Sequence, residues 1–251
     1  PNRFDTSSPL CGPDFARLGI TKAPNSYGPD SLWTYEVGSK NVAAGGRLVM
    51  NAAIFYTDWK KIQQQVDLPT CGFQFIANVG AATVKGAELS LEAALPAGLK
   101  LGGNVTYTQG RITESAPGVS AEVGQPMLDT PKWMGNVFGD YRVPGLERIA
   151  GTLHLEYKYR GSSIRAFDSV ATISNPDGSL SQIADPSQVQ QSYKVVNLDF
   201  GVTWKQWQGH LFVNNVTDAS PVLDDGSRVN LIAVRTTLRP RTIGLGVRTT
   251  F

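Results

Sequence analysis

The chain has 251 residues, of which 41% are hydrophobic, and its formal net charge is +2. It contains no run of about 18 or more apolar residues, which excludes a transmembrane helix. The small net charge and the lack of a basic cluster argue against nucleic acid as a partner. This composition suits a soluble protein. It equally suits a transmembrane β-barrel, in which lipid-facing and lumen-facing residues alternate and average out.

Residues 1–30 are rich in Pro, Gly, Ser and Asp and are predicted to form a loop-like segment. They lack the basic and apolar regions of a signal peptide, so we expect a mature form or, more specifically, a fragment of an exported protein. Cys11 and Cys71 lack the paired spacing of a zinc or redox site. They are therefore either an oxidised pair or two unrelated loop thiols. No metal and no cofactor are predicted.

Helical periodicity is nearly absent after residue 30, and alternating segments recur between turn residues. Nine strands are predicted, at 32–42, 47–67, 73–95, 99–112, 132–143, 148–160, 192–204, 208–216 and 241–251. Tight turns alternate with the short loop 68–72 and the long loops 113–131, 161–191 and 217–240. Consecutive strands without crossover helices exclude an α/β fold and predict an all-β, antiparallel, up-and-down sheet.

The last strand shows what this sheet faces. Ile243, Leu245 and Val247 point to one side, and the alternation continues to the terminal Phe251. Soluble domains usually end in a polar, frayed tail, so an apolar strand up to the last residue indicates a lipid-facing sheet. Aromatic residues near strand ends are typical of membrane-interface girdles: Trp133, Tyr141, Tyr157, Tyr159 and Trp204. We therefore predict a segment of a transmembrane β-barrel.

Charged side chains fall on the other side of the predicted strands. We expect them to line an aqueous lumen: Glu88, Glu92, Asp140, Arg142, His154, Glu156, Lys158, Arg160 and Asp199. Phe55 and Trp59 break this sorting in the second strand. Glu88 and Glu92 lie about 13 Å apart along a strand, too far for an acid–base pair. Neither His154 nor His210 neighbours a nucleophile motif, so no catalytic residue is predicted.

Two charged loop stretches are candidates for contact with a ligand or a cation. One contains Asp177, and the other contains Asp224, Asp225 and Arg228. A solvated loop explains the same residues.

Several motifs, in a fixed order, give the chain a resemblance to the C-terminal part of a TonB-dependent outer-membrane receptor. They are SLWTYEVGSK (31–40), LVMNAAIFYTDWKKIQ (48–63), NVGAATVKGAELSLEAAL (78–95), LKLGGNVTYTQGRI (99–112), TPKWMGNVFGDY (130–141), FVNNVTDASPV (212–222) and RPRTIGLGVRTTF (239–251). The resemblance covers residues 31–251. It implies a barrel of about 22 strands in a bacterial outer membrane, of which this chain supplies the last nine or so. It also implies an N-terminal plug and a TonB-contacting segment, which are missing here.

The resemblance further implies a set of partners. These are outer-membrane lipid, the TonB complex acting through the missing plug, and a small-molecule ligand such as an iron–siderophore or another nutrient. The barrel assembly machinery would recognise Phe251. Two alternatives stay open: a passive porin-like channel complete in these residues, and a soluble β-rich binding protein or enzyme.

Overall fold

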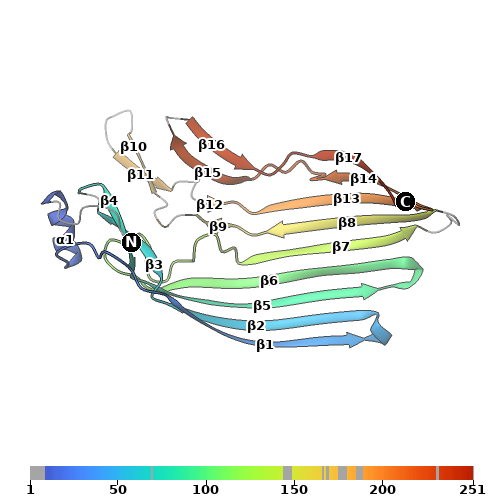
Figure 1. Cartoon of the computed structure of the whole chain (residues 1–251), viewed down its shortest axis with the longest axis horizontal. Coiled ribbons are helices and arrows are strands. Elements are labelled where there is room, and N and C mark those ends of the chain that lie inside the picture. Colours follow the sequence, from blue (N-terminus) through green and yellow to red (C-terminus); the bar gives the residue numbers. More distant parts are fainter. Residues whose placement is uncertain are drawn as a thin grey trace.

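One curved antiparallel sheet dominates the computed structural model of the chain (Figure 1). The structure describes residues 9–68, 70–143, 149–165, 167, 170–174, 180–184, 189–229 and 232–250. Within them the sheet has nine strands in the order β1-β2-β5-β6-β7-β8-β13-β14-β17. Their bounds are β1 Ser31–Ala43, β2 Leu48–Lys60, β5 Ala81–Ala94, β6 Leu99–Glu114, β7 Trp133–Val143, β8 Ala150–Arg160, β13 Tyr193–Trp204, β14 Trp207–Asn214 and β17 Thr242–Thr249. This sheet, called the wall below, confirms the predicted all-β, up-and-down arrangement.

The connections sort to the two ends of the wall. Tight turns lie at one end, which we call the turn end; η2 (Ala44–Gly46) joins β1 to β2, and η3 (Pro96–Gly98) joins β5 to β6. Gly45 and Gly98 adopt φ values of 64° and 76°, a left-handed region that favours glycine. The longer connections gather at the opposite end, the loop end (Figure 1). The alternation of tight turns with other connections is thus confirmed.

Four short two-stranded sheets form within the longer connections in the described part of the chain. They are β3 (Gln63–Leu68) with β4 (Phe73–Asn78), β9 (Ser163–Ile164) with β12 (Val189–Gln190), β10 (Val170–Ser174) with β11 (Leu180–Ala184), and β15 (Val222–Val229) with β16 (Ile232–Thr237). The prediction that the second strand runs to 67 and the third begins at 73 is therefore wrong. Lys61, at a φ of 55°, turns the chain out of the wall, and β3 and β4 form a separate two-stranded sheet.

The N-terminal segment was predicted as loop, and this too needs correction. It contains η1 (Pro9–Cys11) and α1 (Gly12–Leu18). Pro13 in the first turn and a left-handed Gly19 at the C-cap are ordinary helix boundaries. None of the described helices has the length and apolarity needed to cross a membrane. Cys11 and Cys71 form a disulfide with a Cα–Cα distance of 5.1 Å, so the oxidised-pair alternative is the correct one.

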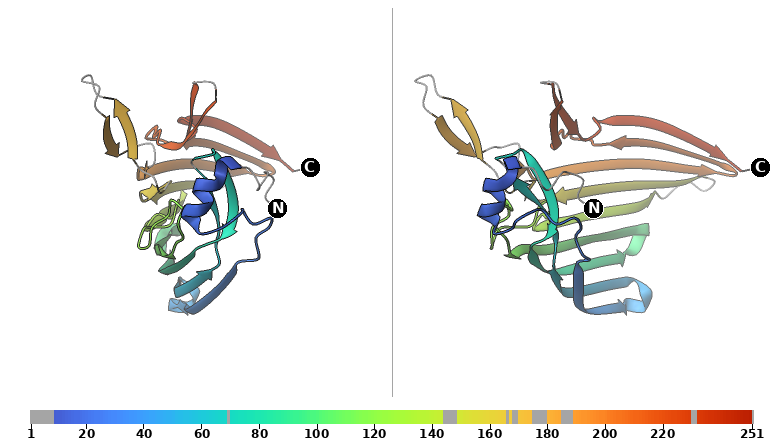
Figure 2. Two further views of the ribbon diagram at one scale, coloured as in Figure 1. Left: turned by 90° about the vertical axis from the view of Figure 1, so that its left-hand side faces the viewer. Right: turned by 60° about the vertical axis from the view of Figure 1, so that its left-hand side comes forward.

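Tight packing is concentrated at the loop end. One cluster of buried residues joins α1 to the β3–β4 hairpin: Cys11, Phe15, Ala23, Val66, Leu68 and Phe75. We call residues 9–23 together with 63–78 the cap. Figure 2 shows the cap within the arc of the curved wall. By contrast, large apolar side chains of the wall remain exposed, with Leu245 74% and Val137 62% accessible.

Candidate functional site

The nine charged residues predicted to line a lumen all lie on one face of the wall. Directly opposite residues in neighbouring strands share a face. Asp140 lies opposite Lys100 and His154, and His154 lies opposite Asp199. The same register places the remaining members, Glu88, Glu92, Arg142, Glu156, Lys158 and Arg160, on this polar face. The register therefore brings them together, while a role in lining a lumen stays a prediction.

Glu156 on β8 joins three strands through its carboxylate. The side-chain amide of Asn136 on β7 donates to Oε1 at 3.4 Å, and that of Asn197 on β13 donates to Oε2 at 3.0 Å. The ammonium of Lys158 lies 3.0 Å from Oε2. Glu156 therefore links β8 to both of its neighbouring strands on the polar face.

Two histidine–aspartate pairs form a row near the turn end of the polar face. His154 Nδ1 lies 2.6 Å from Asp140 Oδ1, and His210 Nδ1 lies 3.0 Å from Asp199 Oδ2. Within the described residues, no group of three or more His, Cys, Asp or Glu side chains could hold a metal ion. His210 was not predicted from the sequence to lie on the polar face. The signal was its spacing of two residues from the polar Gln208 in the same strand, because alternate residues of a strand share a face.

Phenylalanines on the polar face explain why the sorting by polarity breaks. Each lies opposite a glycine in the neighbouring strand: Phe55 and Gly86, Phe138 and Gly102, Phe212 and Gly244. A Cβ at Gly86 would come within 2.5 Å of Phe55 Cζ, so the ring occupies the space that a side chain would need. Aromatic rings commonly cover glycines in this way across paired strands. The signal was the glycine that lies opposite each phenylalanine of the polar face. This pairing can be recognised only when the register of the strands is known.

A cavity of about 580 Å³ lies at the loop end of the polar face, between the wall, the cap and the connection that follows β6. Its lining includes Trp59 and Ile112 of the wall, Gln65 and Asp67 of β3, and Ser120 and Met127 of the connection. The indole Nε1 of Trp59 donates to Asp30 Oδ2 at 2.7 Å, which fixes the ring. A cavity of this size, with a mostly apolar lining and a few polar groups, is typical of small-molecule sites. The cavity was not predicted from the sequence.

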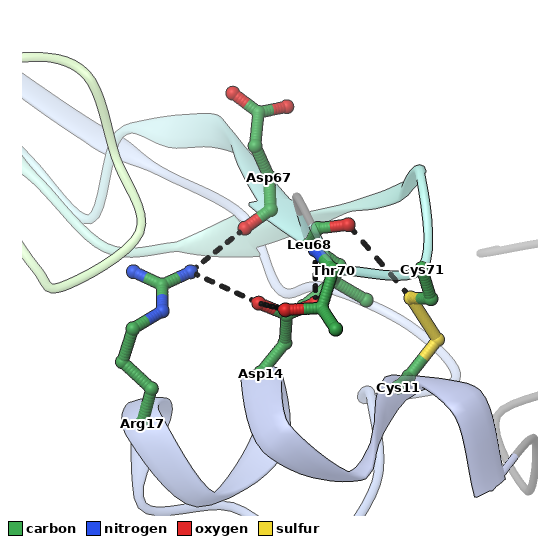
Figure 3. Close-up of a disulfide and its surroundings, with 7 residues drawn as sticks. All are labelled: Cys11, Asp14, Arg17, Asp67, Leu68, Thr70 and Cys71. Atoms are coloured by element: carbon green, nitrogen blue, oxygen red, sulfur yellow. Dashed lines mark hydrogen bonds and ion pairs between the residues drawn. A yellow bond between two sulfur atoms is a disulfide. The ribbon is translucent and has the colours of Figure 1, made fainter.

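The two parts of the cap, residues 9–23 and 63–78, are joined by the disulfide and by a buried carboxylate (Figure 3). Asp14 is 2% exposed and accepts hydrogen bonds from the backbone N–H of Thr70 at 2.9 Å and from its hydroxyl at 3.1 Å. Arg17 lies 3.6 Å from the same carboxylate and donates to the carbonyl oxygen of Asp67 at 3.2 Å. Since Asp67 lines the cavity, these contacts fix one of its walls.

The predicted loop candidates are less informative. Asp177 lies outside the described residues, as does Phe251. Asp224, Asp225 and Arg228 belong to β15 rather than to a loop tip, because 222–229 pairs with β16. Their side chains are outside the described part of the structure. A role for these residues in ligand contact therefore stays a prediction.

The wall and its two chemically different faces define the class of protein: a segment of an antiparallel β-barrel. A sequence model of the family described as "TonB dependent receptor-like, beta-barrel" matches residues 12–216. The chain therefore belongs to this family, whose members are outer-membrane transporters rather than enzymes.

Individual relatives agree with this assignment. The chain is similar to the probable TonB-dependent siderophore receptor PiuA of Acinetobacter baumannii, at 29% identity over 130 residues, which are 52% of this chain and 16% of the relative. Among solved structures, the ferric yersiniabactin uptake receptor FyuA from Yersinia pestis has a TM-score of 0.67 at 18% identity, covering 88% of this chain and 30% of that chain. The siderophore receptor PiuA from A. baumannii has a TM-score of 0.64 at 20% identity, covering 86% and 28%. The chain thus spans less than a third of the length of these relatives.

Proposed function

We propose that this chain forms part of the wall of an outer-membrane receptor that imports a scarce small ligand by TonB-dependent active transport. An iron–siderophore is the foremost ligand class, and another nutrient is the broader one. One observation supports this most directly: over 86–89% of its length the chain is similar in fold to a ferric yersiniabactin uptake receptor, a pyoverdine outer membrane receptor and a siderophore receptor. In this proposal, residues 31–251 are the barrel portion.

The orientation follows from the two ends of the wall. Outer-membrane barrels have short periplasmic turns and longer extracellular loops. The turn end therefore faces the periplasm, and the loop end with the cap and the cavity faces the outside. The polar face lines the lumen, while the opposite apolar face, with residues such as Leu245 and Val137, contacts lipid.

In this arrangement the ligand arrives at the loop end and meets the cavity before it reaches the charged residues deeper on the polar face. The plug and the TonB complex, which lie outside this chain, supply gating and energy. The charged residues of β15 and Asp177 remain candidates for first contact with the ligand.

The test is uptake of radioactive iron chelates by iron-starved cells that express the full receptor containing this chain and no other iron receptor. We expect saturable uptake of at least one chelate, abolished when the TonB complex is inactivated. A control strain carries the empty vector. Uptake that persists without the TonB complex would indicate a passive channel and overturn the proposal.

A further inference from the structure

The cavity at the loop end has one acidic residue and no basic residue in its described lining. Among the described residues that line it, Asp67 carries the only formal charge, and the others are apolar or neutral, such as Trp59, Met127 and Ser120. Two neighbouring arginines are absent from the described lining and have other partners. Arg17 contacts the Asp14 carboxylate and the backbone carbonyl of Asp67, and Arg111 donates to the carbonyl of Gly124.

The Asp67 carboxylate is available to the cavity. Its Oδ1 accepts a hydrogen bond from Gln65 Nε2 at 2.8 Å, and Gln65 also lines the cavity. Figure 3 shows this carboxylate directed away from the Asp14–Arg17 pair, so that pair does not neutralise it. The backbone of Asp67 is fixed independently, because its N–H donates to the carbonyl of Gly118 at 3.0 Å. The side chain can therefore be changed without removing the contacts that position β3.

An anionic group in this cavity would meet a carboxylate and apolar walls, with no described cationic lining residue to pair with it. Burial of an unpaired anion is costly, and a like charge nearby adds to the cost. A neutral group meets neither penalty and gains from contact with Trp59, Ile112 and Met127.

We propose that this cavity is a subsite for an uncharged, largely apolar part of the ligand, and that it selects neutral iron chelates over anionic ones. The ligand class is then a trishydroxamate chelate, in which three singly charged groups neutralise iron(III). A triscatecholate chelate carries three negative charges and is disfavoured. This inference rests on the proposed function, because it assigns the ligand class of the same receptor.

The experiment measures equilibrium binding of two radioactive probes to the purified full receptor: a neutral ferric trishydroxamate and a trianionic ferric triscatecholate. We expect the neutral chelate to bind at least about tenfold more tightly. Asp67→Asn keeps the backbone contacts and a side-chain acceptor but removes the charge. It should tighten binding of the trianionic chelate by about tenfold and so reduce the preference for the neutral chelate by about the same factor.

A second variant tests the location. Ser120→Trp fills the cavity and should weaken binding of the neutral chelate by about tenfold or more. Val123→Trp is the matched control, because Val123 is on the same connection, is 66% exposed and is absent from the described lining. Heat-modifiable migration in electrophoresis checks that each variant assembles. If Ser120→Trp does not assemble, Asp67→Asn still decides the question.

The inference is overturned if the neutral chelate does not bind, if the wild type prefers the trianionic chelate, or if Asp67→Asn leaves the preference unchanged. It is also overturned if Ser120→Trp assembles and binds normally. These results are separate from the proposed function, which fails when no chelate is taken up in a TonB-dependent manner, whatever the binding preference.

Discussion

The wall and the cap are stabilised in opposite ways. The wall is a single sheet with large apolar side chains exposed on one face, and its internal stabilisation comes from the hydrogen-bonded ladder between its nine strands. The cap is small, but it has a buried cluster, a disulfide and a buried carboxylate that accepts two hydrogen bonds. The difference indicates two environments. A sheet without a packed core suits lipid on one side, whereas a disulfide-stabilised unit suits an oxidising aqueous surface.

The cap should therefore depend on its disulfide, and the wall should not. Replacing both cysteines, Cys11→Ala with Cys71→Ala, removes a crosslink between residues 60 positions apart. Loop-closure entropy for such a separation amounts to about 4 kcal/mol. We expect fast hydrogen exchange at the amides of Val66 and Leu68 in the cap, and unchanged protection in β6 and β7.

Reduction of the wild type by dithiothreitol is the control, and it should reproduce the exchange pattern of the double variant. Equal loss of protection in the cap and the wall would show that the two regions unfold together, and the comparison would fail.

The wall should instead be sensitive where backbones approach closely. A Cβ at Gly86 would lie 2.3 Å from the carbonyl oxygen of Tyr107 on the neighbouring strand. Gly86→Ala should therefore cost about 3 kcal/mol by forcing β5 and β6 apart, and lower the yield of heat-modifiable barrel.

Gly209→Ala on β14 is the matched control, because the nearest atom to its Cβ would be 3.9 Å away. We expect normal assembly for this variant. Equal yields for the two variants would contradict the close packing of the wall around Gly86.

The wall could largely be predicted from the sequence, and the cap could not. Alternation of polar and apolar residues reports strand and face directly, which is why nine strands and the shared polar face were found. Alternation also continued past Lys61 into β3, so the sequence hid the point at which the chain leaves the wall. A lysine at positive φ gives no compositional signal of the kind that glycine or asparagine gives.

Part of the cap was nevertheless visible. Pro13 in the first turn and Gly19 at the C-cap are ordinary signals for the start and end of α1. They were hard to recognise because the surrounding segment is itself rich in Pro, Gly and Ser. The disulfide and the cavity depend on contacts between segments far apart in the chain. Trp59, Asp67 and Met127, for example, line the cavity together because the tertiary fold brings their segments to one place.

Within the cap, the buried carboxylate should have the next largest effect. Asp14→Ala leaves the N–H of Thr70 without its acceptor and removes one of the two partners of Arg17. Loss of a buried acceptor typically costs about 2 kcal/mol. We expect faster hydrogen exchange at Thr70 and Val66 with the disulfide intact.

Arg17→Met keeps both hydrogen bonds from Thr70 to Asp14 and removes the contacts of Arg17 with the Asp14 carboxylate and the Asp67 carbonyl. It should cost clearly less than Asp14→Ala. A larger effect for Arg17→Met would assign the stabilisation to the two contacts of Arg17 rather than to the hydrogen bonds between Thr70 and Asp14.

The smallest expected effect concerns an ion pair on the polar face of the wall. Lys100 Nζ lies 2.9 Å from Glu92 Oε1, with both side chains close to half exposed, and 5.9 Å from the centre of the Phe138 ring. In contact with water, such a pair contributes about 0.5 kcal/mol. Lys100→Gln should therefore leave the denaturation midpoint of the full receptor nearly unchanged. Glu156→Gln weakens contacts to two other strands and should lower the midpoint measurably.

The comparison of the two variants shows whether water reaches the polar face. A cost of several kcal/mol for Lys100→Gln would mean that the polar face is dry and covered by protein at this position, because the same charge pair is stabilised far more strongly once water is excluded.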